Sequence, residues 1–223
     1  MLQFFTINTS VEILCFISAL VFLRKDPERI WQLLILFLLI TCATEIIAIP
    51  IKKRYIADPL HVRPNIWLYN ILMIFQIAFY TLMFHYLLQK YTYKWIVYLG
   101  FSAVLAAYAC ETISHGIFEY DVVTKTIMSS LIIIYCLFYY YNLFKDESRI
   151  DLSVSADFWW VAGILFFSFG STMSNLFYKK IEAVLINHKH YIGYIFNVLN
   201  IILYGCWTYA FICRKWMTKT SVP

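Results

Sequence analysis

The sequence predicts an all-α polytopic membrane protein, a seven-transmembrane helix bundle that forms a single domain over residues 1–223. Two observations carry this prediction. Of the 223 residues, 62% are hydrophobic and only 14% are charged, whereas soluble domains carry roughly a quarter charged residues. Seven long apolar runs also follow one another, each about as long as the ~20 residues that a helix needs to cross a hydrocarbon core. The predicted spans are 3–23, 30–50, 66–88, 95–117, 122–144, 157–178 and 190–213.

The first two spans are separated by the charged segment "RKDPER" at 24–29. No basic residue precedes the first span. The second span starts beside Trp31, an amphipathic ring of the kind that prefers the membrane interface, and it ends at Pro50. All five prolines lie at span ends, in connections or in the tail, so we expect the helices to be unbroken.

Tryptophan also marks the start of the third, fourth and sixth spans, at Trp67, Trp95 and the pair Trp159 and Trp160. The fifth and seventh spans are predicted from their length and hydrophobicity alone. Every run is continuously apolar, whereas a barrel strand alternates over segments of about ten residues. The pattern therefore favours helices.

The basic residues indicate the orientation in the membrane. With the N-terminus outside, ten Lys and Arg residues fall in inner connections and eight in outer ones. The first span gives the stronger signal, because it has no basic residue before it and "RKDPER" directly after it. We therefore expect an N-out/C-in topology.

The cysteines and the net charge exclude several functions. All six cysteines fall inside predicted spans without a C-x-x-C pair, so we expect apolar packing and neither disulfides nor a metal site. The net charge of +5 comes from basic residues that are scattered. We expect membrane lipids as neighbours, no nucleic-acid partner and no cofactor.

Polar residues inside the spans are the candidate ligand-binding residues. An acidic residue at a helix centre costs about 2.5–3.5 kcal/mol on insertion scales, so it usually faces a wet or protein-lined interior. One hypothesis is a cavity in the outer half of the bundle, with Glu45, Glu111 and Asn197 pointing inward within about 10 Å of one another. The alternative is hydrogen bonding between tightly packed helices. The candidates are Glu45, Glu111, His115, Asn197, Asn200, Glu12, Gln76, Asn70 and Asn175.

Two short motifs raise the possibility of catalysis. "ETISH" puts Glu111 and His115 four residues apart on one helical face, and "NHKH" puts His188 and His190 in an outer loop. The chain resembles seven-helix lipid hydrolases in helix count but has no Asp beyond the first residue of a span and no intrahelical H-x-x-x-H. The seventh span has no lysine for a retinal Schiff base, which excludes a rhodopsin.

Three segments carry a resemblance to a family: "NIWLYNILMIFQ" at 65–76, "DFWWVAGILFFSFGS" at 157–171 and "YIFNVLNIILYGCW" at 194–207. With these segments the chain resembles the small stand-alone seven-helix membrane proteins of Bacteroidota-type bacteria. Those proteins are uncharacterised and similar in layout to the seven-helix sensor portions of membrane histidine kinases. The resemblance implies a sensory or accessory subunit whose output passes to a separate signalling partner, since the chain ends at Pro223 shortly after the last span.

The expected function is therefore that of a non-enzymatic sensor or accessory subunit in a bacterial inner membrane, with an outward-facing polar cavity for a small ligand. The first alternative is a membrane-embedded lipid hydrolase that uses Glu111, His115 and Glu45. A small-solute transporter comes third, because no internal repeat or broken helix is visible.

Overall fold

The computed structural model describes residues 6–90, 94–146, 151–184 and 190–220, with 175–184, 190–193 and 217–220 described by backbone alone. These ranges contain seven α-helices, one short 3-10 helix and no strand. The predicted all-helical fold is confirmed. The elements are α1 (Ile7–Leu23), α2 (Arg29–Ala57), α3 (Ile66–Leu88), α4 (Lys94–His115), α5 (Val122–Lys145), η2 (Leu152–Val154), α6 (Ala156–Val184) and α7 (His190–Thr220).

The helices have the length and composition of membrane spans. In the described residues, α2, α3, α4, α5 and residues 194–216 of α7 are each long and apolar enough to cross a bilayer, and α1 is a shorter apolar helix. Large apolar side chains are exposed on the outer surface of the bundle, among them Leu14, Leu36 and Ile134. The chain is thus a multi-pass membrane protein whose apolar outer surface suits a lipid environment.

The boundaries of α2 correct one prediction. The sequence places the end of the second span at Pro50, but α2 continues to Ala57 with Pro50 inside it. A proline in a helix interior has no N–H to offer the carbonyl four residues earlier, here that of Ile46, yet the helix continues beyond it. At 29 residues α2 is about 43 Å long, more than a hydrocarbon core of about 30 Å requires. The last two turns of α2, after Pro50, therefore extend beyond the length that a hydrocarbon core requires.

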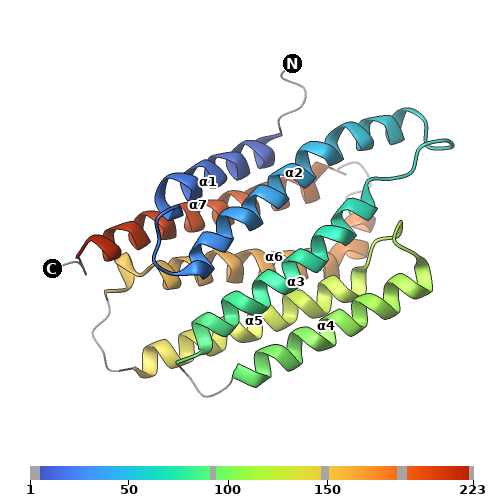
Figure 1. Ribbon diagram of the computed structural model, residues 1–223. Coiled ribbons are helices and arrows are strands. Elements are labelled where there is room, and N and C mark those ends of the chain that lie inside the picture. The colour runs from blue at the N-terminus through green and yellow to red at the C-terminus, as the bar shows by residue number, and fades with distance from the viewer. Residues whose placement is uncertain (1–5, 91–93, 147–150, 185–189, 221–223) are drawn as a thin grey trace.

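The seven helices form a closed ring of neighbours (Figure 1). Each helix packs against the next one in the chain, and α7 packs against α1 to complete the ring. Successive helices run in opposite directions, so the starts of α1, α3, α5 and α7 lie at one end of the bundle together with the end of α2. We call this end the cavity end, for the reason given below, and the other end the tail end.

Aromatic side chains fill the centre of the ring. The indole rings of Trp160 and Trp207 stack with centroids 5.7 Å apart and an interplanar angle of 7°. Trp207 also donates from Nε1 to the carbonyl of Trp160 at 3.2 Å. Gly163 lets α6 and α7 approach closely, because a Cβ there would lie 3.1 Å from the Leu203 carbonyl oxygen. The middle of the bundle is therefore filled by closely packed side chains.

A buried ion cluster closes the tail end. Arg214 of α7 contacts Asp26 in the α1–α2 connection through Nε and Oδ2 at 2.9 Å. Its Nη2 also lies 3.0 Å from Oε1 of Glu28. Only 2% of the Asp26 side chain is exposed, so the charges compensate each other away from water.

Candidate functional site

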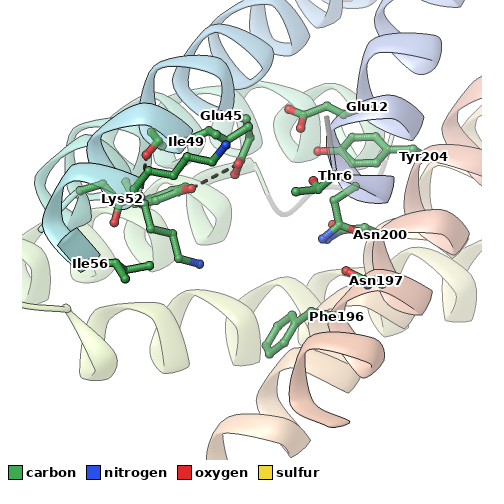
Figure 2. Close-up of a pocket in the computed structure, with 15 residues that line it drawn as sticks. Thr6, Glu12, Glu45, Ile49, Lys52, Ile56, Phe196, Asn197, Asn200 and Tyr204 are labelled. Atoms are coloured by element: carbon green, nitrogen blue, oxygen red, sulfur yellow. Dashed lines mark hydrogen bonds between the residues drawn. The ribbon is translucent and has the colours of Figure 1, made fainter. Parts of the chain in front are cut away.

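The cavity end contains a cavity of about 760 Å³ between α1, α2, α3 and α7 (Figure 2). This volume is within the range of small-molecule sites. Most of the lining residues are polar, with acidic, basic, amide and hydroxyl side chains. The lining residues are Thr6, Asn8, Glu12, Glu45, Ala48, Ile49, Lys52, Lys53, Ile56, Asn65, Tyr69, Phe196, Asn197, Asn200 and Tyr204.

One face of α2 forms a long wall of the cavity. Glu45, Ile49, Lys52 and Ile56 recur at steps of four, three and four residues, which is the period of one helical face. Seven residues separate Glu45 from Lys52, a rise of roughly 10 Å along the helix axis. Glu45 therefore lies deeper in the bundle, and Lys52 lies toward its outer rim.

Glu45 is held from the neighbouring helix. The hydroxyl of Tyr69 on α3 donates to Oε2 of Glu45 at 3.2 Å. The amide of Asn65, just before α3, reaches the Ala48 carbonyl of α2 at 3.4 Å. These two contacts join α2 to α3 along the cavity wall.

Glu12 of α1 supplies the second carboxylate. It is only 3% exposed, and its Oε1 has no hydrogen-bond partner in the described structure. Figure 2 shows Glu12 facing the hydroxyl of Tyr204 from α7, with Glu45 on the other side of the space. Two carboxylates from different helices thus lie deep in the same cavity.

Amide side chains complete the lining. Asn197 and Asn200 lie three residues apart on α7, and Tyr204 follows four residues later on the same face. Asn8 of α1 also lines the cavity, and its Oδ1 is buried without a partner in the described structure. Four of the nine predicted residues, Glu12, Glu45, Asn197 and Asn200, therefore share this cavity.

Glu111 does not lie in the cavity, contrary to the hypothesis that groups it with Glu45 and Asn197. Its carboxylate accepts hydrogen bonds from the backbone N–H of Val123 at 3.1 Å and of Thr124 at 2.8 Å. The Thr124 hydroxyl donates as well, at 2.8 Å. The first N–H groups of a helix have no partner within the helix and favour negative charge, so Glu111 is explained as a cap for α5.

The remaining predicted residues lie elsewhere or outside the described side chains. His115 is exposed, 4.0 Å from the Glu119 carboxylate. Asn70 is fully buried and donates to the carbonyls of Ile117 and Glu119 at 2.9 and 2.7 Å, which fixes the α4–α5 connection. Gln76 is half-buried on α3 and does not line the cavity. The side chains of Asn175, His188 and His190 are outside the described part of the chain.

Sequence reasoning missed several lining residues. Lys52 and Lys53 counted as loop residues because the second span was ended at Pro50, although Lys52 lies seven residues after Glu45 on one helical face. Tyr204 follows the predicted residue Asn200 by four positions, on the same face of α7. Nothing in the sequence marks Tyr69, whose role depends on how α2 and α3 pack.

The chemistry of the cavity lining is that of carboxylate, amine, amide and hydroxyl side chains. Among the described residues no group of three or more His, Cys, Asp or Glu side chains lies close enough to hold a metal ion. The six cysteines are free thiols, and none of them lines the cavity. The lining thus offers charges, amides and hydroxyls that can form ion pairs and hydrogen bonds.

Comparisons with protein-family models, curated proteins and solved structures gave no match. The functional argument therefore rests on the cavity itself.

Proposed function

We propose that this chain is a non-enzymatic sensor or accessory subunit of a bacterial inner membrane, which binds a small polar ligand in the cavity between α1, α2, α3 and α7. The observation that carries the proposal is the pair of carboxylates, Glu12 and Glu45, from two helices inside one cavity with Lys52 at its rim. Ionisable groups in a membrane bundle are costly and are usually functional.

The N-out topology predicted from the sequence puts this cavity toward the outside. The cavity lies at the end where α1 begins, and the basic-free start of the sequence favours an outer N-terminus. An outward-facing cavity is accessible to solutes outside the cell or to lipids of the outer leaflet.

The connection between the two ends of the bundle favours a sensor. α1, α2 and α7 contribute most of the cavity lining, and the same three helices meet at the tail end through Arg214, Asp26 and Glu28. A ligand that draws α1 and α2 together at the cavity end changes the distances between the charged groups of this ion cluster. A partner protein at the inner face would detect that change.

The lipid hydrolase is less favoured by the arrangement of its residues. It needs Glu111, His115 and Glu45 around one substrate, but Glu111 caps α5 and only Glu45 lines the cavity. A transporter needs a path through the centre, where Trp160 and Trp207 are stacked and buried.

Ligand binding is tested with the full chain in lipid nanodiscs. Thermal unfolding is followed by intrinsic tryptophan fluorescence with a panel of amino acids, amines, organic acids and sugars at millimolar concentration. A ligand at 100 times its Kd stabilises the folded state by about 2.7 kcal/mol. Glu45→Gln should abolish the response to the active compound, and Glu119→Gln, an exposed carboxylate outside the cavity, should keep it.

Two further assays separate the alternatives. Release of fatty acid from phospholipid or ceramide by the purified protein, lost in His115→Ala, would favour the hydrolase. Uptake of the active compound into proteoliposomes would favour the transporter. The absence of any response across the panel would contradict the proposal.

A further inference from the structure

The polar groups of the cavity are arranged by charge along its depth. Glu12 and Glu45 lie toward the interior of the bundle, and Lys52 lies two helical turns further out on the same face of α2 as Glu45. The cavity therefore has a negative inner part and a positive rim.

The two charge types form no direct ion pair in the described structure. In the described chain no ion pair within 4.0 Å joins Lys52 to Glu45 or to Glu12. A rise of roughly 10 Å separates the backbones of Glu45 and Lys52 along the helix axis. A ligand that lies between the two side chains can pair with both charges.

One carboxylate oxygen in the inner part has no donor in the described structure. Oε1 of Glu12 has no hydrogen-bond partner in the described structure, although only 3% of the residue is exposed. A buried carboxylate oxygen without a donor costs free energy. Glu45 has one donor, the Tyr69 hydroxyl at 3.2 Å. A protonated amine carries up to three N–H donors and a positive charge, which satisfies both carboxylates at once.

The α2 wall is less polar in the middle of the cavity. Ala48 and Ile49 lie between Glu45 and Lys52 on α2, and Phe196 of α7 is on the opposite side (Figure 2). An alkyl linker fits against these side chains. Along α2 the lining thus changes from carboxylate to apolar side chains and then to lysine, from inside to outside.

Building on the proposed function, we infer that the ligand is a zwitterion, with a protonated amine between Glu12 and Glu45, a short alkyl linker along Ile49, and an anionic group at Lys52. Two sources supply this chemistry. One is a free ω-amino acid or amino phosphate, and the other is the headgroup of an aminophospholipid in the outer leaflet.

The free-ligand arm uses the full chain in nanodiscs of phosphatidylglycerol, which carries no amine. Calorimetric titration compares 4-aminobutyrate and 6-aminohexanoate with butylamine, which lacks the anion, and butyrate, which lacks the amine. Glycine tests the length, because its amine and carboxylate are too close to reach both ends of the cavity. We expect at least one ω-amino acid to bind at least about 30-fold more tightly than butylamine, butyrate and glycine. This factor corresponds to the lower end of the cost of losing one partner of a desolvated charge pair.

Variants then assign each end of the ligand. Lys52→Met should reduce the affinity for the ω-amino acid to that of butylamine and leave butylamine binding unchanged. Glu12→Gln should reduce the affinity for the ω-amino acid to the affinity that the parent chain has for butyrate. The matched controls are Lys25→Met, an exposed lysine at the tail end, and Glu119→Gln, an exposed carboxylate outside the cavity. Both controls should bind like the parent chain, and Lys52→Met keeps the test valid if Glu12→Gln fails to fold.

The lipid arm uses native mass spectrometry of the protein in nanodiscs with added phosphatidylethanolamine. Retention of one phosphatidylethanolamine that is lost in both Lys52→Met and Glu12→Gln would identify the lipid headgroup as the source. Binding of butylamine as tight as that of the ω-amino acids would overturn the inference, because the lysine end would then be irrelevant. Binding of a neutral sugar or simple acid, with no zwitterion bound in either arm, would overturn the inference but leave the proposed function in place. If no compound of the panel binds, both the inference and the proposed function are contradicted.

Discussion

Arg214 and Asp26 form a bidentate ion pair across 188 positions of sequence, with Nε–Oδ2 and Nη2–Oδ1 distances of 2.9 and 3.2 Å. The pair ties the end of α7 to the connection between α1 and α2. Arg214 also lies over the ring of Trp31, 5.4 Å from its centroid. One side chain thus closes the tail end of three helices.

Loss of either partner of this ion pair should destabilise the fold strongly. Arg214→Gln leaves Asp26 charged, with only 2% of its side chain exposed. Removing one partner of a buried pair typically costs about 3–5 kcal/mol. Unfolding in detergent should show this loss, and the double variant Asp26→Asn with Arg214→Gln should lose less than the sum of the single variants. Additive losses would contradict a direct coupling, and Lys25→Gln at the same end should have little effect.

Glu111 is predicted to stabilise α5 without any role in ligand response. Its carboxylate accepts three hydrogen bonds at the start of that helix. Glu111→Ala should therefore lower stability by about 0.5–2 kcal/mol, the usual cost of losing an N-terminal cap. The response to the ligand of the cavity should persist in this variant at permissive temperature. A folded Glu111→Ala variant that no longer responds would return Glu111 to the binding site.

The contrast between Glu45 and Glu111 shows how far the sequence could predict the site. Helical period and hydrophobicity gave seven helices and showed that both carboxylates are within apolar runs. The period gives the face of one helix, but it does not say which neighbour that face meets. Glu111 contacts the start of α5, and Glu45 lines a cavity. This difference depends on how the seven helices pack around the ring, which the sequence of one helix does not determine.

The extent of α2 was the other unpredictable feature. Proline predicts a helix end on local grounds, and that rule placed Lys52 in a loop. In the structure the helix passes Pro50 and brings Lys52 onto the face of Glu45. The positive rim of the cavity therefore became visible only in the folded bundle.

Asp121 should make stability depend on pH. This residue precedes α5 and is 1% exposed, with neither carboxylate oxygen bonded in the described structure. Burial, and then the nearby Glu111 charge, raise the pKa of Asp121. A raised folded-state pKa means that the stabilisation is present below the unfolded pKa, about 3.9, and is lost as pH rises through the folded value.

The matching variant is Asp121→Asn, which cannot ionise. It should unfold at a higher temperature than the parent chain at pH 7, and the difference should shrink as the pH falls below the folded pKa of Asp121. Thermal scans from pH 4 to pH 8 measure this. A parent chain that is as stable as Asp121→Asn at pH 7 would contradict the prediction, and Glu119→Gln serves as the control for an exposed carboxylate.

The topology should be N-out, with the cavity end outside. In a cysteine-free background, a cysteine at Ala57, the exposed end of α2, should react with an impermeant maleimide added to intact cells. A cysteine at Val154, exposed in the 3-10 helix of the opposite end, should react only after the cells are opened. The reverse labelling would turn the cavity toward the cytoplasm, and the ligand would then be an internal one.

The last prediction decides whether Glu45 binds a ligand or only joins two helices. Its single hydrogen bond in the described structure comes from the Tyr69 hydroxyl at 3.2 Å. If this contact is the purpose of Glu45, Tyr69→Phe and Glu45→Gln should each reduce stability, with a coupling near the ~0.6 kcal/mol average for polar contacts between membrane helices. Ligand response should then fall in proportion to stability.

If Glu45 holds the ligand instead, the two variants should behave differently. Glu45→Gln keeps the shape and still accepts from Tyr69, so its stability should change by less than about 1 kcal/mol while ligand affinity is lost. Tyr69→Phe keeps the carboxylate in the cavity and should retain ligand binding. The free energy of unfolding with and without ligand, measured for both single variants and the double variant, separates the two cases. Equal losses of ligand binding in both single variants would leave Glu45 as a contact between α2 and α3.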